Sequence, residues 1–395
     1  MTVAEALTAL APERRAPVLD AVPALGGVPA RGVHAGAALP AHARATVDGY
    51  AVRAADTYAA SETLPALLEL SGAVAMGRAP DGEVTPGAAM AIPTGGLLPH
   101  GADAVVMVEH SSEPMPGHVE LLRGVAPGDG VLQPGEEARA GDVLVPAGRP
   151  LRAAELGLLA AAGVTRIAVH ARPRVGIVST GDEIVPAGTA APAPGQVRDA
   201  CAPALAGLVL EAGGDPVPRG IVADDAVALE RVLAAAIAED DMVVVSAGSS
   251  VGARDLTATV VARLGRVVCH GLAVRPGKPT LLADCDGVPL VGLPGNPRSA
   301  LVVFRLVGMP LVRAVAGVTA PSPLPSLRAR LDRDVPSAAG RLDVVQVAVR
   351  DGIASPLFGS SALLGPMTRA DGWFCVPEAD TGLGAGTEVE VVLYA

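Results

Sequence analysis

Aromatic side chains are scarce in this sequence: Phe, Tyr and Trp together make up only 2% of its 395 residues. Ala, Val and Leu must therefore fill the hydrophobic cores. Charged residues are also few, at 18%, whereas hydrophobic residues reach 50%. This composition excludes a disordered chain and leaves enough apolar material for two to four domains.

Paired cysteines and long apolar runs are absent as well. The four cysteines stand alone at positions 201, 269, 285 and 375, so there is no CxxC zinc or redox motif. No basic region followed by an apolar one marks a secretory signal. The longest uncharged stretch, residues 84–102, is interrupted by three prolines, which argues against a membrane span. We therefore expect a cytoplasmic protein with reduced thiols.

Basic residues are outnumbered: 30 Lys and Arg stand against 41 Asp and Glu, and the net charge is −11. Nucleic acids call for clustered basic side chains, so no nucleic-acid partner is expected. A small anionic ligand is still compatible with this charge, because it needs only a few local donors.

The chain divides into segments of different character. Residues 1–45 begin with a helical pattern and then become rich in Pro, Gly and Ala. Residues 46–135 alternate short apolar runs with turns, which predicts a small β-rich unit. Residues 136–171 include a helix. After a Pro-rich linker at 319–324, alternating valines in residues 325–395 predict a small β-barrel or sandwich.

Residues 172–318 alternate apolar strands with helices. The pattern predicts strands at 174–179, 216–222, 242–247, 266–274, 279–284 and 288–293, and helices at 199–212, 224–238, 256–264 and 298–316. This rhythm is typical of an α/β domain with a doubly wound, mostly parallel sheet. In such sheets, ligands bind beyond the carboxyl ends of the strands.

Acidic residues follow two of these strands. The run Ser179–Glu183 (Ser-Thr-Gly-Asp-Glu) places a glycine turn before two carboxylates that can hold a divalent metal or a polar substrate. Alternatively, it only begins a capped helix. Asp224 and Asp225 follow the next strand, where Asp224 either approaches the first loop or simply caps the helix at 224–238.

Two further loops carry anion-binding features. Residues 246–255 (Ser-Ala-Gly-Ser-Ser-Val-Gly-Ala-Arg-Asp) expose backbone N–H groups and hydroxyls, or form a flexible loop without ligand. Prolines on both sides of Lys278 fix the direction of one cation, unless Lys278 is only a surface residue. Asn296 and Pro297 are expected to be the N-cap and the first residue of a helix, and the free N–H groups at a helix N-terminus can bind phosphate.

Together, the four loops predict a phosphorylated ligand held by backbone donors and Lys278, with carboxylates that bind Mg²⁺. Composition and spacing do not name the substrate.

The ordered set of motifs resembles the molybdopterin molybdenumtransferase (MoeA) family, which includes the gephyrin E domain. The motifs run along nearly the whole chain: Asp48–Arg53, Pro93–Gly95, Gly101–Met107, Gly135–Glu136 with Gly141–Asp142, Pro173–Glu183, Gly220–Asp225, Ser249–Gly252 with Asp255, Pro276–Pro279 and Gly292–Pro297.

The resemblance implies a four-part subunit. Residues 1–45 and 136–171 would form an elongated helical and linking domain, and residues 46–135 an inserted β-rich domain. Residues 172–318 would form an α/β domain of the molybdopterin-binding type, and residues 325–395 a C-terminal β-barrel. It also implies a homodimer in which the segment around Asp48 approaches the α/β site of the other subunit.

The implied reaction is Mg²⁺-dependent: adenylyl-molybdopterin and molybdate give molybdenum cofactor and AMP. The adenylyltransferase and molybdoenzyme acceptors would be partners. The resemblance implies that the catalytic residues are Asp48, Glu183, Asp224, Asp255 and Lys278. The implied substrate-binding residues are Thr94, Thr180, Gly181, Ser249, Ser250, Gly252, Arg275, Pro294, Gly295, Asn296, Arg341 and Ser360. The implied metal ligands are Asp182, Glu183, Asp224 and Asp225.

Two alternatives belong to other functional classes. The chain could be a divergent, non-catalytic relative that acts as a pterin-binding or scaffold protein, as the gephyrin E domain does. It could also be a molybdopterin adenylyltransferase, because the α/β domain type is shared, although the additional domains argue against this.

Overall fold

The structure is a computed structural model that describes residues 1–12, 16–247, 251–320 and 324–394, with the backbone alone at 251–255. The described residues form two compact units. Unit 1 comprises Met1–Arg31, Ala147–Arg152 and Arg166–Ala395, and unit 2 comprises Gly32–Pro146 and Ala153–Thr165. The four-part division expected from the sequence stays a prediction.

Unit 1 contains a six-stranded sheet in the order β17-β14-β18-β22-β21-β19. Its strands are β14 (Arg174–Thr180), β17 (Asp215–Val222), β18 (Met242–Ser246), β19 (Arg266–His270), β21 (Leu281–Cys285) and β22 (Val288–Leu293). The first four strands in the order are parallel, and β21 and β19 are antiparallel additions at one edge. Fully buried valine runs such as that of β18 are typical of a parallel sheet covered on both faces.

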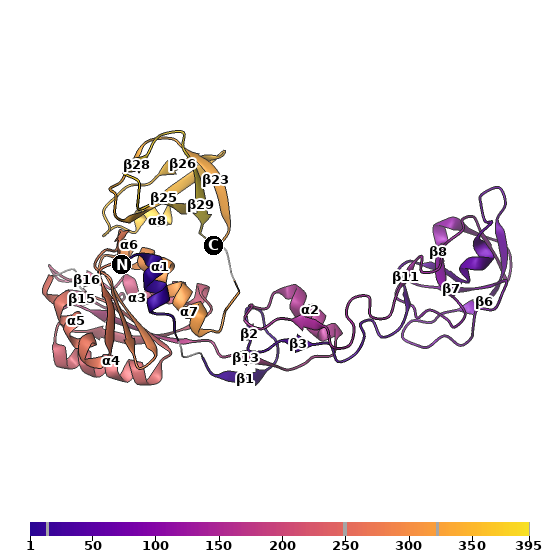
Figure 1. Cartoon of the computed structure of the whole chain (residues 1–395), viewed down its shortest axis with the longest axis horizontal. Helices are drawn as coiled ribbons and strands as arrows, with labels where there is room; N and C mark the ends of the chain where they lie inside the picture. The colour runs from indigo at the N-terminus through magenta and orange to yellow at the C-terminus, as the bar shows by residue number, and fades with distance from the viewer. Residues whose placement is uncertain (13–15, 248–250, 321–323, 395) are drawn as a thin grey trace. The chain divides into compact units, whose positions relative to one another are not determined.

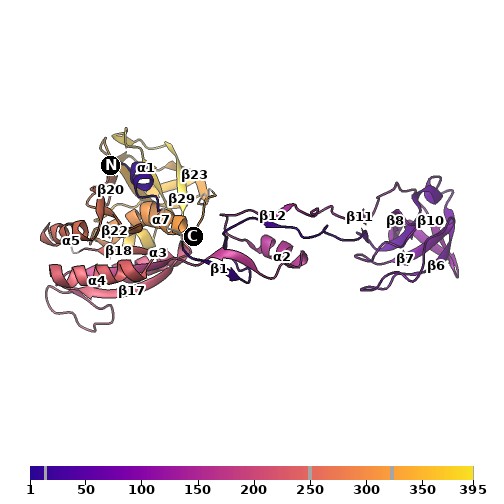
Figure 2. The same cartoon turned by 60° about the horizontal axis from the view of Figure 1, so that its bottom comes forward.

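Helices cover both faces of this sheet (Figures 1 and 2). One face packs against α1 (Val3–Ala9), α3 (Cys201–Glu211), α6 (Pro297–Val303), a π-helical turn (Phe304–Gly308) and α7 (Met309–Val315). The other packs against α4 (Ala226–Glu239) and α5 (Val251–Leu264). The doubly wound α/β fold predicted from the sequence is therefore confirmed.

One predicted strand was wrong in extent. The run 266–274 is interrupted after His270, and β20 (Val274–Arg275) leaves the sheet to pair in parallel with β25 (Leu342–Arg350) of the C-terminal region. The turn between them is held by Gly271 N–H, which donates to the Thr280 carbonyl at 2.8 Å. This turn carries the chain from the α/β sheet to the barrel.

A five-stranded barrel closes the C-terminal region of unit 1. Its strands are β23 (Ser326–Leu331), β25 (Leu342–Arg350), β26 (Ile353–Pro356), β27 (Gly372–Val376) and β29 (Glu388–Leu393), and β25 pairs with both β26 and β27. Val347, Phe374 and Val391 lie in its core. Val344 faces the other way and packs into the α/β core, so β25 is buried on both sides and even Gln346 is fully buried.

Shorter elements complete unit 1. Strands β1 (Val18–Ala21), β13 (Ile167–His170) and β2 (Val28–Pro29) form a small sheet, and β15 (Ile184–Val185) pairs with β16 (Val197–Arg198). Strand β24 (Val335–Pro336) pairs with β28 (Gly382–Leu383), and α8 (Gly365–Thr368) is a single turn.

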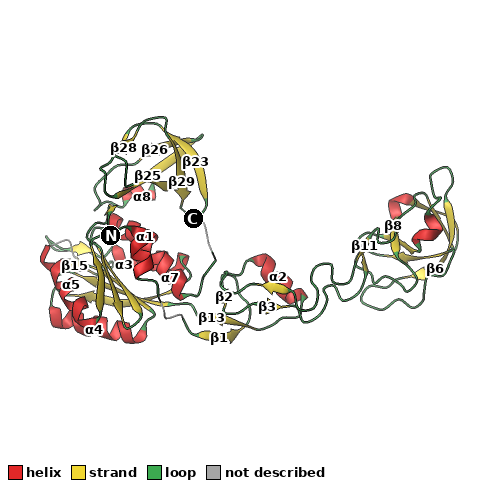
Figure 3. Ribbon diagram, viewed as in Figure 1, coloured by secondary structure: helices red, strands yellow, loops and turns green. Residues whose placement is uncertain are grey.

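Unit 2 is rich in strands (Figure 3). Its six-stranded sheet contains β5 (Gly49–Val52), β6 (Ala66–Ala73), β7 (Ala88–Ile92), β8 (Ala104–Met107), β9 (Ser111–Met115) and β10 (His118–Leu121). Short pairs join β3 (Val33–His34) to β12 (Val143–Val145) and β4 (Arg44–Ala45) to β11 (Val131–Leu132), and α2 (Ala153–Ala161) is also present. Two 3₁₀ turns lie at Ala54–Thr57 and Val108–His110.

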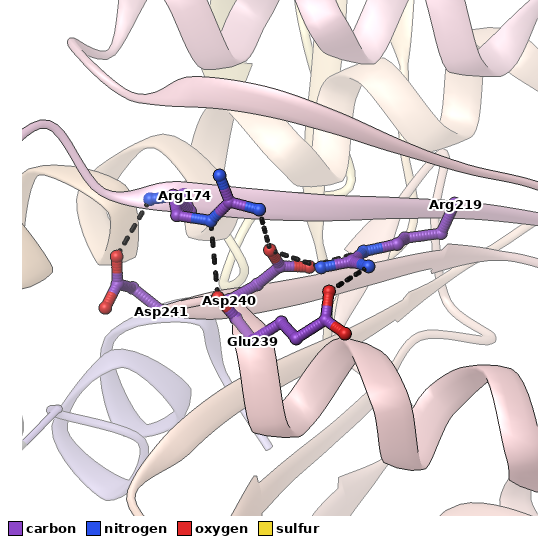
Figure 4. Close-up of polar contacts among 5 residues, drawn as sticks. All are labelled: Arg174, Arg219, Glu239, Asp240 and Asp241. Atoms are coloured by element: carbon purple, nitrogen blue, oxygen red, sulfur yellow. Dashed lines mark hydrogen bonds and ion pairs between the residues drawn. The ribbon is translucent and has the colours of Figure 1, made fainter.

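A bulge in β17 shapes the strand that leads to Asp224. Ile177 pairs with Pro218 and Val178 pairs with Gly220, so Arg219 is the extra residue. Its guanidinium contacts the fully buried carboxylate of Asp240 through Nε at 2.8 Å and Nη2 at 2.7 Å, and Nη1 contacts Glu239 (Figure 4).

Arg174 joins the same network from β14: Nη2 lies 3.3 Å from Asp240 Oδ1, and the backbone N–H donates to Asp241 (Figure 4). The network thus ties the start of β14, the bulge and the end of α4 together. All four cysteines are free. None of the described helices is long and apolar enough to span a bilayer.

Candidate functional site

Three acidic residues, Asp182, Glu183 and Asp224, follow the ends of β14 and β17. Asp224 N–H donates to Asp182 Oδ1 at 3.1 Å. Partial burial, followed by the charges of Asp182 and Glu183, raises the pKa of Asp224. No helix follows Glu183: the chain enters β15, so the capped-helix alternative for this run was wrong.

The two aspartates after β17 have different roles. Asp225, rather than Asp224, is the N-cap of α4, and its Oδ1 accepts the Ala228 N–H at 2.7 Å. This leaves Asp224 free of the capping role that was its alternative. The Asp225 oxygen that caps the helix is occupied, whereas Asp224 faces Asp182.

Behind this cluster, a chain of buried hydrogen bonds links β18, β14 and α3. Ser246 Oγ lies 3.3 Å from Ser179 Oγ, which donates to Asp199 Oδ2 at 2.6 Å. Asp199 Oδ1 accepts the N–H groups of Cys201 and Ala202 and so caps α3. Thr180 Oγ1 is buried and has no hydrogen-bond partner among the described residues.

Lys278 is the only lysine in the sequence. Its carbonyl accepts two N–H groups, from Leu272 and Thr280, both at 2.9 Å, while its side chain is exposed. Before it, Gly277 adopts φ +129°, and a Cβ there would lie 2.3 Å from Val303. The turn is therefore rigid and needs glycine, whereas the cation at its tip has no ion-pair partner in the described part of the chain.

A cavity of about 870 Å³ lies beside Lys278, between the α/β sheet and the barrel of unit 1. Four cationic side chains and one carboxylate line it: Arg275, Lys278, Arg298, Arg341 and Asp343. The cavity is therefore cationic in a protein whose net charge is −11. Such local charge attracts anions.

Asp343 orients two of these arginines. Its carboxylate is nearly fully buried and lies 3.2 Å from Arg275 Nη1 and 3.1 Å from Arg341 Nε. Ser337 Oγ donates to it at 2.8 Å. A buried carboxylate with fixed donors holds the two guanidinium groups on the cavity wall at low entropic cost.

Arg298 is a buried cation on the same wall. It is 6% exposed, and its Nη1 donates to the Gly359 carbonyl at 2.9 Å. Nε has no hydrogen-bond partner among the described residues, and no described carboxylate pairs with Arg298. Burial lowers the pKa of Arg298, and the charge of Arg275 adds to this while Tyr394 opposes it. A bound anion would supply the missing countercharge.

Three family models together match most of the chain. The MoeA N-terminal region (domain I and II) matches residues 1–163. A model described as "Probable molybdopterin binding domain" matches residues 176–314, and the MoeA C-terminal region (domain IV) matches residues 328–394.

Relatives match over most of their own length. A molybdopterin molybdenumtransferase of Bacillus subtilis is 30% identical over 367 residues, which cover 90% of this chain and 84% of that protein. One of Nostoc sp. is 36% identical over 305 residues, or 76% and 70% of the two chains. The chain belongs to the MoeA family.

The solved structures agree with this membership. A molybdopterin biosynthesis MoeA protein from Pyrococcus horikosii is 34% identical, with a TM-score of 0.82 over 100% of this chain and 98% of that one. The predicted family and its fold class, including the closed C-terminal barrel, are therefore confirmed.

The residues expected to form one MoeA site fall into groups. Arg275, Lys278, Pro294, Gly295, Asn296 and Arg341 line the cavity. Ser361 also lines it, whereas Ser360 is exposed and its hydroxyl accepts the Ala362 N–H. The carboxylates Asp182, Glu183 and Asp224 lie at the strand ends, outside the cavity lining, and Gly181 lies in the turn between β14 and them.

Other expected residues lie elsewhere. Asp48 and Thr94 belong to unit 2, where Asp48 Oδ1 accepts the Thr94 N–H at 2.6 Å and its hydroxyl at 2.8 Å. These two hydrogen bonds, the backbone one first, lower the pKa of Asp48. The described residues do not include Ser249 and Ser250. For Gly252 and Asp255, the structure describes only the backbone.

The carboxylate cluster fits Mg²⁺ only in part. Its donors are the hard oxygens that Mg²⁺ prefers. Within the described ranges, however, no three His, Cys, Asp or Glu side chains are already gathered around one point. The cluster could supply one or two ligands, and phosphate oxygens and water would supply the rest.

Proposed function

We propose that this protein catalyses molybdenum insertion: adenylyl-molybdopterin and molybdate give molybdenum cofactor and AMP. The observation that carries the proposal is the cationic cavity, which places Arg275, Lys278 and Arg341 around one space. The substrates carry phosphoanhydride and oxyanion charges, which suit these cations. Related MoeA proteins named molybdopterin molybdenumtransferase support the reaction class.

Lys278 has the main electrostatic role in this proposal. Cleavage of a phosphoanhydride places negative charge on phosphate oxygens, and positioned cations stabilise that charge without a protein nucleophile. Lys278 projects from a rigid turn and has no described carboxylate partner, so its full charge is available. Arg275 and Arg341, held by Asp343, would bind and orient the anionic groups.

The carboxylates at the strand ends would hold the metal. Asp182, Glu183 and Asp224 would supply one or two of its ligands, with Asp225 beside them as the cap of α4. Mg²⁺, when bound there, neutralises charge on the substrate phosphates. Burial first, and then the charges of Asp182 and Glu183, raise the pKa of Asp224, and a bound cation would relieve the repulsion among these carboxylates.

The protein would act as a homodimer. Asp48, ionised and held by Thr94, would reach the α/β site of the other subunit, with Ser249, Ser250 and Asp255 lining the same cleft. Cytoplasmic location, and exchange with an adenylyltransferase and molybdoenzyme acceptors, complete the proposal.

The test uses purified protein with Mg²⁺, molybdate and adenylyl-molybdopterin, and measures AMP release and active cofactor. Lys278→Ala and Asp224→Ala should each lower turnover at least about a hundredfold, the range for loss of one electrostatic group. Arg328→Ala, which removes an exposed arginine of the barrel, is the control and should retain full turnover.

Full turnover in both variants would refute the residue assignment. AMP transfer from ATP onto molybdopterin, without molybdenum insertion, would instead identify an adenylyltransferase. Removal of Mg²⁺ with a chelator should stop turnover and its re-addition should restore it.

A further inference from the structure

Phe358 is an exposed aromatic residue on the cavity wall. The other two phenylalanines of the chain, Phe304 and Phe374, are fully buried in the cores, whereas Phe358 is 53% exposed and lines the cavity. It therefore contributes little to a core. About half of this residue is therefore accessible to a ligand that enters the cavity.

Hydrogen bonds from the start of α6 hold the loop that carries Phe358. Arg298 Nη1 donates to the Gly359 carbonyl at 2.9 Å, and the Arg298 N–H donates to the Ser361 carbonyl at 3.1 Å. Asn296 Nδ2 donates to Ser361 Oγ at 2.9 Å. Asn296 was expected to cap α6 with its side chain, but it makes no such bond and ties down this loop instead.

The surroundings of Phe358 combine apolar surface with positive charge. Pro336 and Val345 line the same cavity as Arg275, Lys278 and Arg341. Buried Arg298, which donates to the Gly359 carbonyl of this loop, has no ion-pair partner among the described carboxylates. A ligand with a flat ring and an anionic chain matches this pairing of an aromatic face with cations.

We propose that Phe358 is a stacking platform for the heteroaromatic ring of an anionic ligand, and so determines specificity in the cavity. The inference rests on the proposed function, whose substrate carries two such rings, an adenine and a pterin. Base–aromatic stacking is tolerant of ring identity, because every base has a π-face. Comparing the binding of an adenine ligand with that of a pterin ligand identifies which ring stacks on Phe358.

The experiment measures binding to the full-length protein by calorimetry. The two probes that bear an aromatic ring are AMP and pterin-6-carboxylate, and the third probe, ribose 5-phosphate, keeps an anionic group but has no aromatic ring. The wild type should bind at least one ring-bearing probe about tenfold more tightly than ribose 5-phosphate, within the range for a stacked base. Phe358→Leu should abolish that preference and leave ribose 5-phosphate binding unchanged.

Two variants serve as controls. Phe358→Tyr keeps the ring and should keep the preference. Ile353→Ala shortens another exposed apolar side chain of the barrel that does not line the cavity, and should leave all three affinities unchanged. Because Phe358 is about half exposed, its variants should fold, which thermal unfolding checks.

A ring preference for AMP alone assigns the platform to adenine, and one for the pterin probe alone assigns it to the pterin. Equal binding of all probes by the wild type, or an unchanged preference in Phe358→Leu, overturns the inference. The molybdenum insertion assay on the wild type is separate: activity there with no ring preference would leave the proposed function standing without this platform.

Discussion

At the scale of single residues, burial decides which charges the cavity presents. Asp343 is buried and partly neutralises Arg275 and Arg341 through ion pairs. Lys278 has no described ion-pair partner. Lys278 could be identified from the sequence because flanking prolines mark a rigid turn. Arg298 and Asp343 were missed, because one lies just inside a helix and the other in a strand, where neither pattern distinguishes them from surface charges.

The pKa values of the four cysteine thiols also depend on burial. Burial first, and then nearby Asp199, raises the pKa of Cys201 to about 12, and burial raises the pKa of Cys375 to about 12. Burial, followed by the negative charges of Asp284 and Asp286, raises the pKa of Cys285 to about 11. Burial also raises the pKa of Cys269.

We expect the native protein at pH 8 to react very slowly with a thiol reagent, because the thiolate is the reactive form. In guanidinium chloride, all four thiols should react within minutes. Since the folded pKa values exceed the ordinary value of 9.0, the stability that these thiols contribute is complete below about pH 9 and is lost as the pH rises toward 11 to 12. Glu62→Cys, an exposed thiol, is the reactive control. Rapid labelling of native wild type would contradict this burial.

At the scale of elements, the bulge in β17 sets where Gly220–Val222 pair with β14, and hence where Asp224 emerges. The bulged Arg219 is held by buried Asp240, whose carboxylate also requires Gly176: a Cβ there would lie 2.4 Å from Asp240 Oδ2. Three elements therefore depend on one buried charge.

Arg219→Ala should lower the free energy of unfolding by about 3 kcal/mol, because it removes the two shortest cationic contacts of buried Asp240 and leaves only Arg174 Nη2 at 3.3 Å. Denaturant titration followed by circular dichroism measures this. Arg172→Ala, which breaks a half-exposed pair with Asp215 at the same sheet, is the matched control and should cost less than about 1 kcal/mol. Similar losses in both variants would show that burial of Asp240 is not decisive.

Strand and helix order in the α/β domain followed from the sequence, because buried valine runs and amphipathic helices differ clearly in period. The bulge and the departure of β20 toward the barrel did not follow, because both depend on side chains distant in sequence. Arg219 meets Asp240 across 21 residues, and Val274 pairs with Leu342 of the C-terminal barrel. Alternation in a strand also cannot show that the face of β25 turned away from the barrel core, which carries Val344 and buried Gln346, packs against the α/β core.

At the scale of the whole molecule, the proposed homodimer predicts that two inactive variants complement each other. Asp48 and Thr94 belong to unit 2, and Lys278 belongs to unit 1. If the site combines Asp48 of one subunit with Lys278 of another, then two inactive variants can complement each other.

Asp48→Ala and Lys278→Ala should each be inactive, but an exchanged mixture should recover about a quarter of wild-type turnover. Half of the random dimers would be mixed, and each mixed dimer would hold one intact site of two. AMP release measures the recovery, and light scattering confirms the dimer. A mixture as inactive as its parts would place both residues in one subunit.

The single lysine has a practical consequence for these measurements. A chain with one ε-amine offers one acylation target of that kind, and here it stands in the proposed site. Mass spectrometry of an acylated peptide that contains residue 278 would thus count ligand-free sites directly. The fraction protected by a bound anion is an occupancy, obtained without any assay of turnover.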